Sequence, residues 1–94
     1  MNKPRDRVVI TAMGANRPGV LAGITRVLAE ANVNIDDVSQ KIMQEFFALI
    51  MVTDFSGANG SFEDIQGRLQ KLADELKVKV FVQHESVFTF MHRL

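Results

Sequence analysis

Residues 14–35 read GANRPGVLAGITRVLAEANVNI, and they join the end of one predicted strand to the start of the next through a turn and a helix. Six apolar residues in this stretch have the spacing that places them on one face of a helix, which leaves Arg26 and Glu30 for water. They are Val20, Leu21, Ile24, Val27, Leu28 and Ala31. Asn32 can end the helix, because Asn tolerates the left-handed conformation that helix ends often require. The stretch therefore predicts one amphipathic helix between two strands.

Further elements are predicted on both sides of this helix. The predicted strands cover residues 7–13, 33–43, 46–55 and 77–83. The first is short and β-branched, the second carries the charges typical of a sheet edge, and the third is apolar on both of its alternating faces. Ser61 and Asp64 form a capping-box-like start. An apolar stripe follows it: Phe62, Ile65, Leu69, Leu72, Ala73 and Leu76. Helical spacing near the end predicts a short C-terminal helix over 86–93.

The resulting order, β-α-β-β-α-β, restricts the fold to few arrangements. Right-handed crossovers place both helices on one face of a four-stranded antiparallel sheet, with the first and third strands central. We therefore expect an α+β fold, a ferredoxin-like βαββαβ sandwich, as a single domain over residues 1–94. The third strand then has an apolar face that its own chain leaves uncovered, and soluble monomers rarely expose such a patch. We predict a homodimer or higher homo-oligomer that covers this face or extends the sheet edge.

Composition and charge exclude several classes of protein. Eleven Lys and Arg residues balance eleven Asp and Glu residues, so a nucleic-acid partner is not expected. The absence of cysteine excludes a thiolate nucleophile, a disulfide framework and a Cys-rich zinc site. The start MNKPRDR is not followed by the apolar segment of a secretory signal, and no segment has the length of a membrane span. We expect a cytoplasmic protein with no membrane partner and no cofactor.

The turn GANRPGVL (14–21) has the features of an anion site. A helix start leaves several backbone N–H groups unpaired and carries partial positive charge, so a carboxylate there gains charge-assisted hydrogen bonds. Gly19 permits close approach, Pro18 suits the first helical turn, and Asn16 can cap the helix or donate its amide to a ligand. The other interpretation, a well-capped turn that holds no ligand, stays open on these residues alone.

The motif in residues 14–35, Asn-x-Pro-Gly-Val-Leu at a helix start and Asn-Ile at the next strand, resembles the ACT domain, a small regulatory module of enzymes of amino-acid metabolism. NIDDVSQ (34–40) is similar to stand-alone ACT proteins related to the glycine-cleavage-system repressor type. The resemblance implies that an amino acid or similar carboxylate binds between chains. The implied ligand-binding residues are Asn16, Arg17, Pro18, Gly19 and Val20, with Asn34 and Ile35 from a neighbouring chain. Gly14 stands where some serine-binding members carry His, so the resemblance does not identify the ligand.

Other residues are weaker candidates for a site. Asp36 and Asp37 are adjacent in a strand and point to opposite faces, so a solvated edge or a bulge is favoured over a carboxylate pair. His84 and His92 belong to no recognisable motif, and we interpret both as surface histidines. The five Met residues, including Met43, Met51 and Met91, are predicted to fill gaps in the core.

Two functions from different classes follow from these observations. The first is a small-molecule sensor that acts through oligomerisation or on a regulated protein. The second is a ligand-free protein–protein interaction module, which docks through its open sheet face and edge strand. An enzyme is not expected, because the residues do not assemble a nucleophile, a base and an orienting group.

Overall fold

A computed structural model of the chain describes residues 5–91. Its elements follow one another as β1 (Arg7–Ala15), α1 (Val20–Glu30), β2 (Asn34–Met43), β3 (Phe46–Asp54), α2 (Phe62–Leu76), β4 (Lys79–His84) and α3 (Glu85–Met91). The first six reproduce the predicted βαββαβ order. The helix α3 lies where the sequence predicts a short C-terminal helix, and residues 92 and 93 of that prediction lie outside the described residues. No helix in the described part of the chain has the length and hydrophobicity to cross a membrane.

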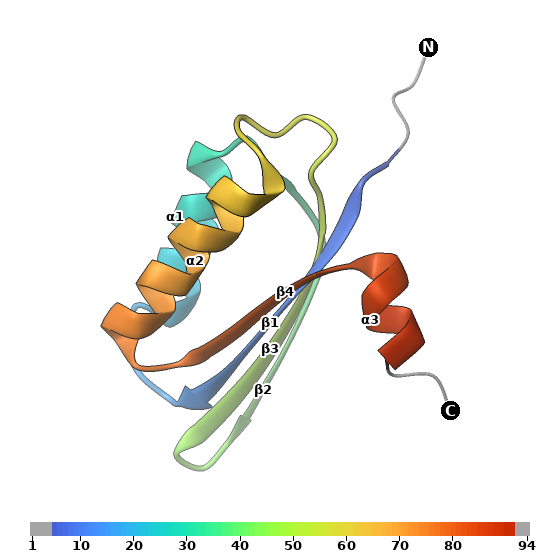
Figure 1. Cartoon of the computed structure of the whole chain (residues 1–94). Helices are drawn as coiled ribbons and strands as arrows, with labels where there is room; N and C mark the ends of the chain where they lie inside the picture. Colours follow the sequence, from blue (N-terminus) through green and yellow to red (C-terminus); the bar gives the residue numbers. More distant parts are fainter. Residues whose placement is uncertain (1–4, 92–94) are drawn as a thin grey trace.

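The four strands form one antiparallel sheet in the order β2-β3-β1-β4. Helices α1 and α2 lie side by side on one face of this sheet, and α3 lies on the other (Figure 1). The first and third strands are therefore central, as predicted, and the fold is a ferredoxin-like α+β sandwich. The strand β2 forms one edge, and its pairing with β3 shifts between Ile35 and Asp37. This bulge confirms that Asp36 and Asp37 form an irregular edge.

The core fills the space between the sheet and the two long helices. Its largest fully buried side chains are Ile10, Ile24, Leu28, Leu49, Met51, Ile65 and Leu69, together with Val8 and Thr53. The prediction that Leu21 shares the buried face of α1 is wrong, because Leu21 is 39% exposed. The buried stripe runs through Val20, Ile24 and Leu28 at intervals of four residues, and Leu21 lies about 100° around the helix from Val20.

The predicted helix boundaries are confirmed at two points. The Ser61 hydroxyl accepts a 3.1 Å hydrogen bond from the Asp64 N–H, and the Asp64 carboxylate accepts a 3.5 Å bond from the Ser61 N–H. These reciprocal bonds complete the capping box at the start of α2. Asn32, just after α1, adopts the left-handed conformation with φ 57°.

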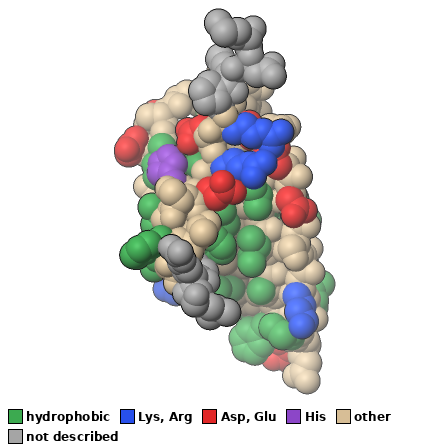
Figure 2. Space-filling model, turned by 90° about the vertical axis from the view of Figure 1, so that its right-hand side faces the viewer, with side chains coloured by type: hydrophobic (Ala, Val, Ile, Leu, Met, Phe, Trp, Pro, Cys, Tyr) green, Lys and Arg blue, Asp and Glu red, His purple; other side chains and the backbone are tan. Residues whose placement is uncertain are grey.

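The two faces of the sheet differ in cover. Phe47, Leu49 and Met51 point from β3 toward the helices and are buried, whereas Phe46 and Ile50, on the alternate face, are 61% and 40% exposed. We call this second face, opposite α1 and α2, the open face. Figure 2 shows it from the front, with hydrophobic side chains gathered over the sheet and at its lower end.

The methionine prediction holds for only one of the three residues it names. Met51 is fully buried, but Met43 and Met91 are 50% and 63% exposed. The prediction is wrong for these two because Met43 pairs with Phe46 and so shares the open face, while Met91 belongs to α3, outside the main core.

Candidate functional site

The loop between β1 and α1 is held at two points. The backbone N–H of Asn16 donates a 2.6 Å hydrogen bond to the Glu45 carbonyl in the β2–β3 turn. The Arg17 guanidinium donates through Nη1 to the Leu76 carbonyl at the end of α2, at 3.1 Å. The loop is thus fixed between the turn and α2. Among the described residues, none forms a hydrogen bond with the Asn16 side-chain amide. That amide is therefore available to a ligand.

The start of α1 differs from the expected geometry. Its first residue is Val20 and its N-cap is Gly19, in the left-handed region with φ 90°. The prediction that Pro18 lies in the first helical turn is wrong, because Pro18 precedes the N-cap. The option that Asn16 caps the helix is also wrong, because no described side chain caps α1. The N–H groups of its first turn therefore lack the side-chain partner that Ser61 provides for α2.

Gly19 faces open space. A side-chain carbon placed there would meet no described atom within 4 Å. Gly19 also borders a groove of about 300 Å³ between the two long helices, together with Ala22, Gly23, Arg26, Val27 and Leu72. The side of the helix start at Gly19 is thus open to a small molecule. A residue other than glycine at this position would destabilise the fold by roughly 1–2 kcal/mol, because its Cβ disfavours a positive φ.

Asn34 and Ile35 lie at the opposite end of the same sheet. Asn34 pairs with Asp54, which pairs with Arg7 at the start of β1, whereas the loop follows Ala15 at its end. The length of β1 separates the two groups by roughly 25 Å. One chain therefore does not bring Asn34 and Ile35 to the loop. The amide of Asn34 donates to Asp36 at 2.8 Å.

The end of the sheet near Asn34 holds a polar hollow of about 290 Å³, lined by Asn32, Val33, Asn34, Asp54, Ser56 and Gly57. The Asp54 carboxylate accepts hydrogen bonds from the backbone N–H of Ser56 at 2.9 Å and of Asp6 at 3.1 Å. These donors, that of Ser56 first, hold the pKa of Asp54 below its ordinary value of 3.8, because they stabilise the charged form. Asp54 thus anchors the ends of β1 and β3.

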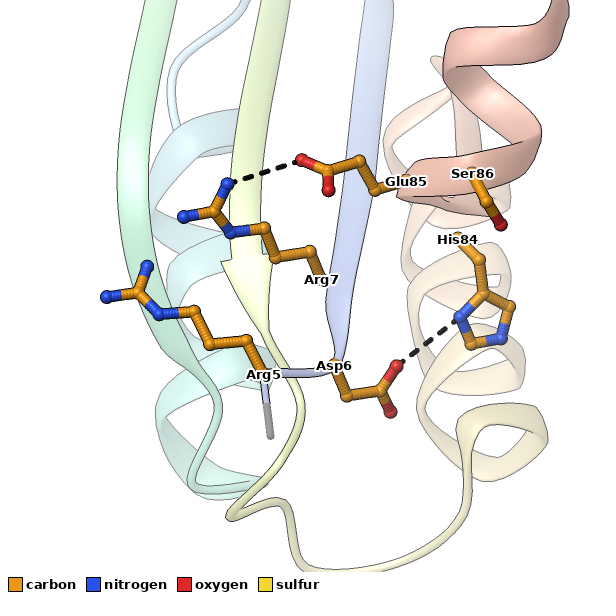
Figure 3. Close-up of a pocket in the computed structure, with 6 residues that line it drawn as sticks. All are labelled: Arg5, Asp6, Arg7, His84, Glu85 and Ser86. Carbon is orange, nitrogen blue, oxygen red and sulfur yellow. Dashed lines mark hydrogen bonds and ion pairs between the residues drawn. The ribbon is translucent and has the colours of Figure 1, made fainter. Parts of the chain in front are cut away.

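A larger hollow, of about 430 Å³, was not predicted from the sequence. It is lined by Arg5, Asp6, Arg7, His84, Glu85 and Ser86, as Figure 3 shows. Arg7 contacts Glu85 and His84 contacts Asp6, each at 3.5 Å. His84 also stacks on Phe62, with ring centroids 4.4 Å apart. Cations and carboxylates here compensate one another, so the hollow favours no particular charge. Its members come from the two ends of the chain, which is why no sequence motif marks it. His92 lies outside the described residues.

Fold and site together define a small α+β domain whose first loop exposes an uncapped helix start. Comparison with known families matches residues 6–83 to the ACT domain. A UPF0237 protein of Methanopyrus kandleri is 49% identical over 88 residues, which cover 94% of this chain and 98% of that protein. The chain belongs to the ACT domain family. ACT domains are typically regulatory domains that bind small molecules, and neither they nor the UPF0237 proteins are catalytic families.

Solved structures agree with this assignment. An ACT domain protein from Streptococcus pneumoniae superimposes with a TM-score of 0.76 at 28% identity, covering 90% of this chain and 96% of that one. A structure titled as a putative glycine cleavage system transcriptional repressor gives a TM-score of 0.67 at 23% identity, over 87% of this chain and 47% of that one. The second likeness shows the fold alone.

Proposed function

We propose that this chain is a regulatory domain that binds an amino acid or a similar small carboxylate at the loop before α1. The observation that carries the proposal is the uncapped start of α1, with the open space at Gly19 and the available amide of Asn16 beside it. A carboxylate there would accept bonds from the first-turn N–H groups and interact favourably with the positive end of the helix. Arg17 adds a cation nearby. Membership of the ACT family supports the same class of ligand.

A second copy can supply Asn34 and Ile35 through the free edge of β2. If β2 pairs antiparallel with β2 of another chain, the start of one strand meets the end of the other. That end, Met43, pairs with Phe46, which in turn pairs with Ala15 beside the loop. The charges also match when the pairing is centred on Ser39, because Asp37 then lies opposite Lys41 of the partner and like charges do not meet. The ligand then lies between the two chains.

Thermal-shift measurements with each of the twenty amino acids test ligand binding. A ligand that binds only the folded state raises the melting temperature. Calorimetric titration of the best ligand is then compared among wild type, Asn16→Ala and Asn34→Ala, with Asn59→Ala as an exposed asparagine outside the site. We expect the first two variants to lose roughly 10-fold or more in affinity, the effect of removing a hydrogen bond to a charged group, and Asn59→Ala to match wild type. Equal affinity in all four proteins would place the ligand elsewhere.

Charge exchange tests the edge pairing independently of any ligand. Asp37→Lys and Lys41→Asp each place like charges opposite one another in the paired edge, so each variant alone should form fewer pairs by sedimentation. An equal mixture should recover pairing, because the two changes are complementary. If both variants assemble as wild type does, the edge of β2 is not the interface.

The alternative function, a ligand-free interaction module, is favoured by one observation, the apolar open face. Absence of a thermal shift with all twenty amino acids, in a protein that still self-associates, would favour this alternative. The two functions are therefore separated by the ligand screen rather than by the oligomeric state.

A further inference from the structure

The helix α3 carries an apolar face that stays largely exposed in the described part of the chain. Val87, Phe90 and Met91 have the i, i+3, i+4 spacing of one helical face and are 47%, 77% and 63% exposed. None of the residues of α3, all within the described part of the chain, is buried. The helix packs against β1 and β4, and its contacts include the Arg7–Glu85 ion pair and a 3.3 Å bond from the Gln83 amide to the Met91 sulfur. Within residues 5–91, the apolar stripe is thus only partly covered.

The open face also has exposed apolar side chains, in the part that α3 does not contact. The helix α3 contacts β1 and β4, where Val9 is buried although it alternates with the helix-facing residues of β1. Toward the β2–β3 turn the face lacks cover from the described residues (Figure 1). We call this part the apolar floor, and it consists of Met13, Met43, Phe46, Ile50 and Phe81, which are 40–61% exposed. The register places these residues on one face, since Met43 pairs with Phe46, and Ile50 and Phe81 both pair with Thr11.

We infer that the apolar floor of one chain binds α3 of a second copy of the same chain, reciprocally. The floor and α3 lie toward opposite ends of one face. A two-fold axis in the plane of that face and perpendicular to the strands exchanges the two ends, so each α3 meets the partner's floor. Both contacts are then identical, as a two-fold interface requires. A helix on an apolar sheet face is also the packing that α1 and α2 already use on the other side.

The exposed apolar area is sufficient for such an interface. Eight large side chains, five in the floor and three on α3, are 40–77% exposed on the same side of the molecule. Together they offer on the order of several hundred Å², comparable with the roughly 800 Å² that each partner contributes to a standard interface. Monomeric proteins rarely expose a patch of that size. The interface is distinct from the β2 edge, so a chain that uses both forms assemblies larger than a dimer.

Two variants test the two sides of this contact, the apolar floor and α3, one at a time. Phe46→Glu disrupts the floor but leaves α3 intact, and Phe90→Glu disrupts α3 but leaves the floor intact. Both side chains are largely exposed, so folding should survive, which circular dichroism checks. Leu21→Glu, an exposed apolar position on α1, is the matched control. Sedimentation velocity at tens of micromolar should give each of the two variants half the mass of the wild-type assembly. Their association should be at least about 100-fold weaker, because a central aromatic contact is lost. Leu21→Glu should match wild type.

Mixing the two variants gives the decisive result. In each homodimer both helix-on-floor contacts are broken, but a mixed dimer retains one, formed by α3 of the Phe46→Glu chain and the floor of the Phe90→Glu chain. An equal mixture should therefore recover part of the association. A monomeric wild type, wild-type mass in both variants, or no recovery on mixing would each overturn the inference. Loss of mass in the β2 charge variants alone would point instead to the edge as the only interface.

Discussion

Leu49 and Ile50 are neighbours in β3, yet they meet different surroundings. Leu49 points toward α1 and α2 and is fully buried, whereas Ile50 points to the open face and is 40% exposed. Their apolar character is the same, and the strand alternates them between two faces. The difference shows that one face of the sheet stabilises the monomer, while the other is available for contacts beyond it.

The largest expected effect compares these two neighbours. Leu49→Ala should destabilise the fold by about 2–5 kcal/mol, because it removes buried contacts and leaves a cavity. Ile50→Ala should cost less than about 1 kcal/mol in the monomer, since its side chain is partly in water already. Urea unfolding at two protein concentrations measures both. The cost of Leu49→Ala should not depend on concentration, whereas that of Ile50→Ala should grow with it; equal costs at both concentrations would remove the distinction between the faces.

A smaller effect on stability is expected from the threonine hydroxyl groups, Thr53 on the helix-covered face and Thr11 on the open face. Thr53 is fully buried on the helix-covered face and donates to the Val8 carbonyl at 2.7 Å. Thr53→Val should cost about 1 kcal/mol through the lost hydrogen bond. Thr11, half-buried on the open face, provides the control, and Thr11→Val should change stability by less than about 0.5 kcal/mol. Chemical unfolding of both variants makes the comparison, and an equal cost for both would show that the Thr53 bond contributes nothing specific.

The smallest effect on stability is expected at Asp54, the last residue of β3. The pKa of Asp54 is lower in the folded state than its ordinary 3.8, so the charged carboxylate stabilises the fold above that pH. The contribution is lost as the pH falls through the lower, folded value. Asp54→Asn should therefore melt below wild type at about pH 7, and the difference should shrink below about pH 4. Melting curves from about pH 3 to pH 7 measure it. A difference that stays constant would mean that the charge is not involved.

Local patterns account for most of what could be predicted. The apolar spacing of residues 20–31, the Ser61–Asp64 capping box and the charged second strand each report a short-range preference. The helix, the capping box and the edge position of β2 are confirmed. Fold class followed because few topologies accommodate βαββαβ. The prediction failed where neighbours in space decide burial. Leu21, Met43 and Met91 are apolar like the core residues, but the elements that would cover them are absent from the described part of the chain.

Local sequence patterns predicted only part of the candidate site. The sequence indicated the loop, since Asn16 and Gly19 precede a periodic helix. It did not indicate that Gly19 is the N-cap, that Pro18 lies outside the helix, or that the Asn16 side chain remains without a partner in the described residues. These depend on backbone dihedrals and on contacts with Glu45 and Leu76, which are distant in sequence.

The sequence by itself determined the elements, their order and the family, because helix and strand periods and turn residues act over a few positions. Only the tertiary structure decided which apolar residues are buried, where Asn34 lies relative to the loop, and that α3 and the open face each expose an apolar surface. These properties depend on which elements pack together, and packing is set by contacts between segments far apart in the chain. The same physical reason places Leu49 in the core and leaves Ile50, one residue later, partly exposed on the open face.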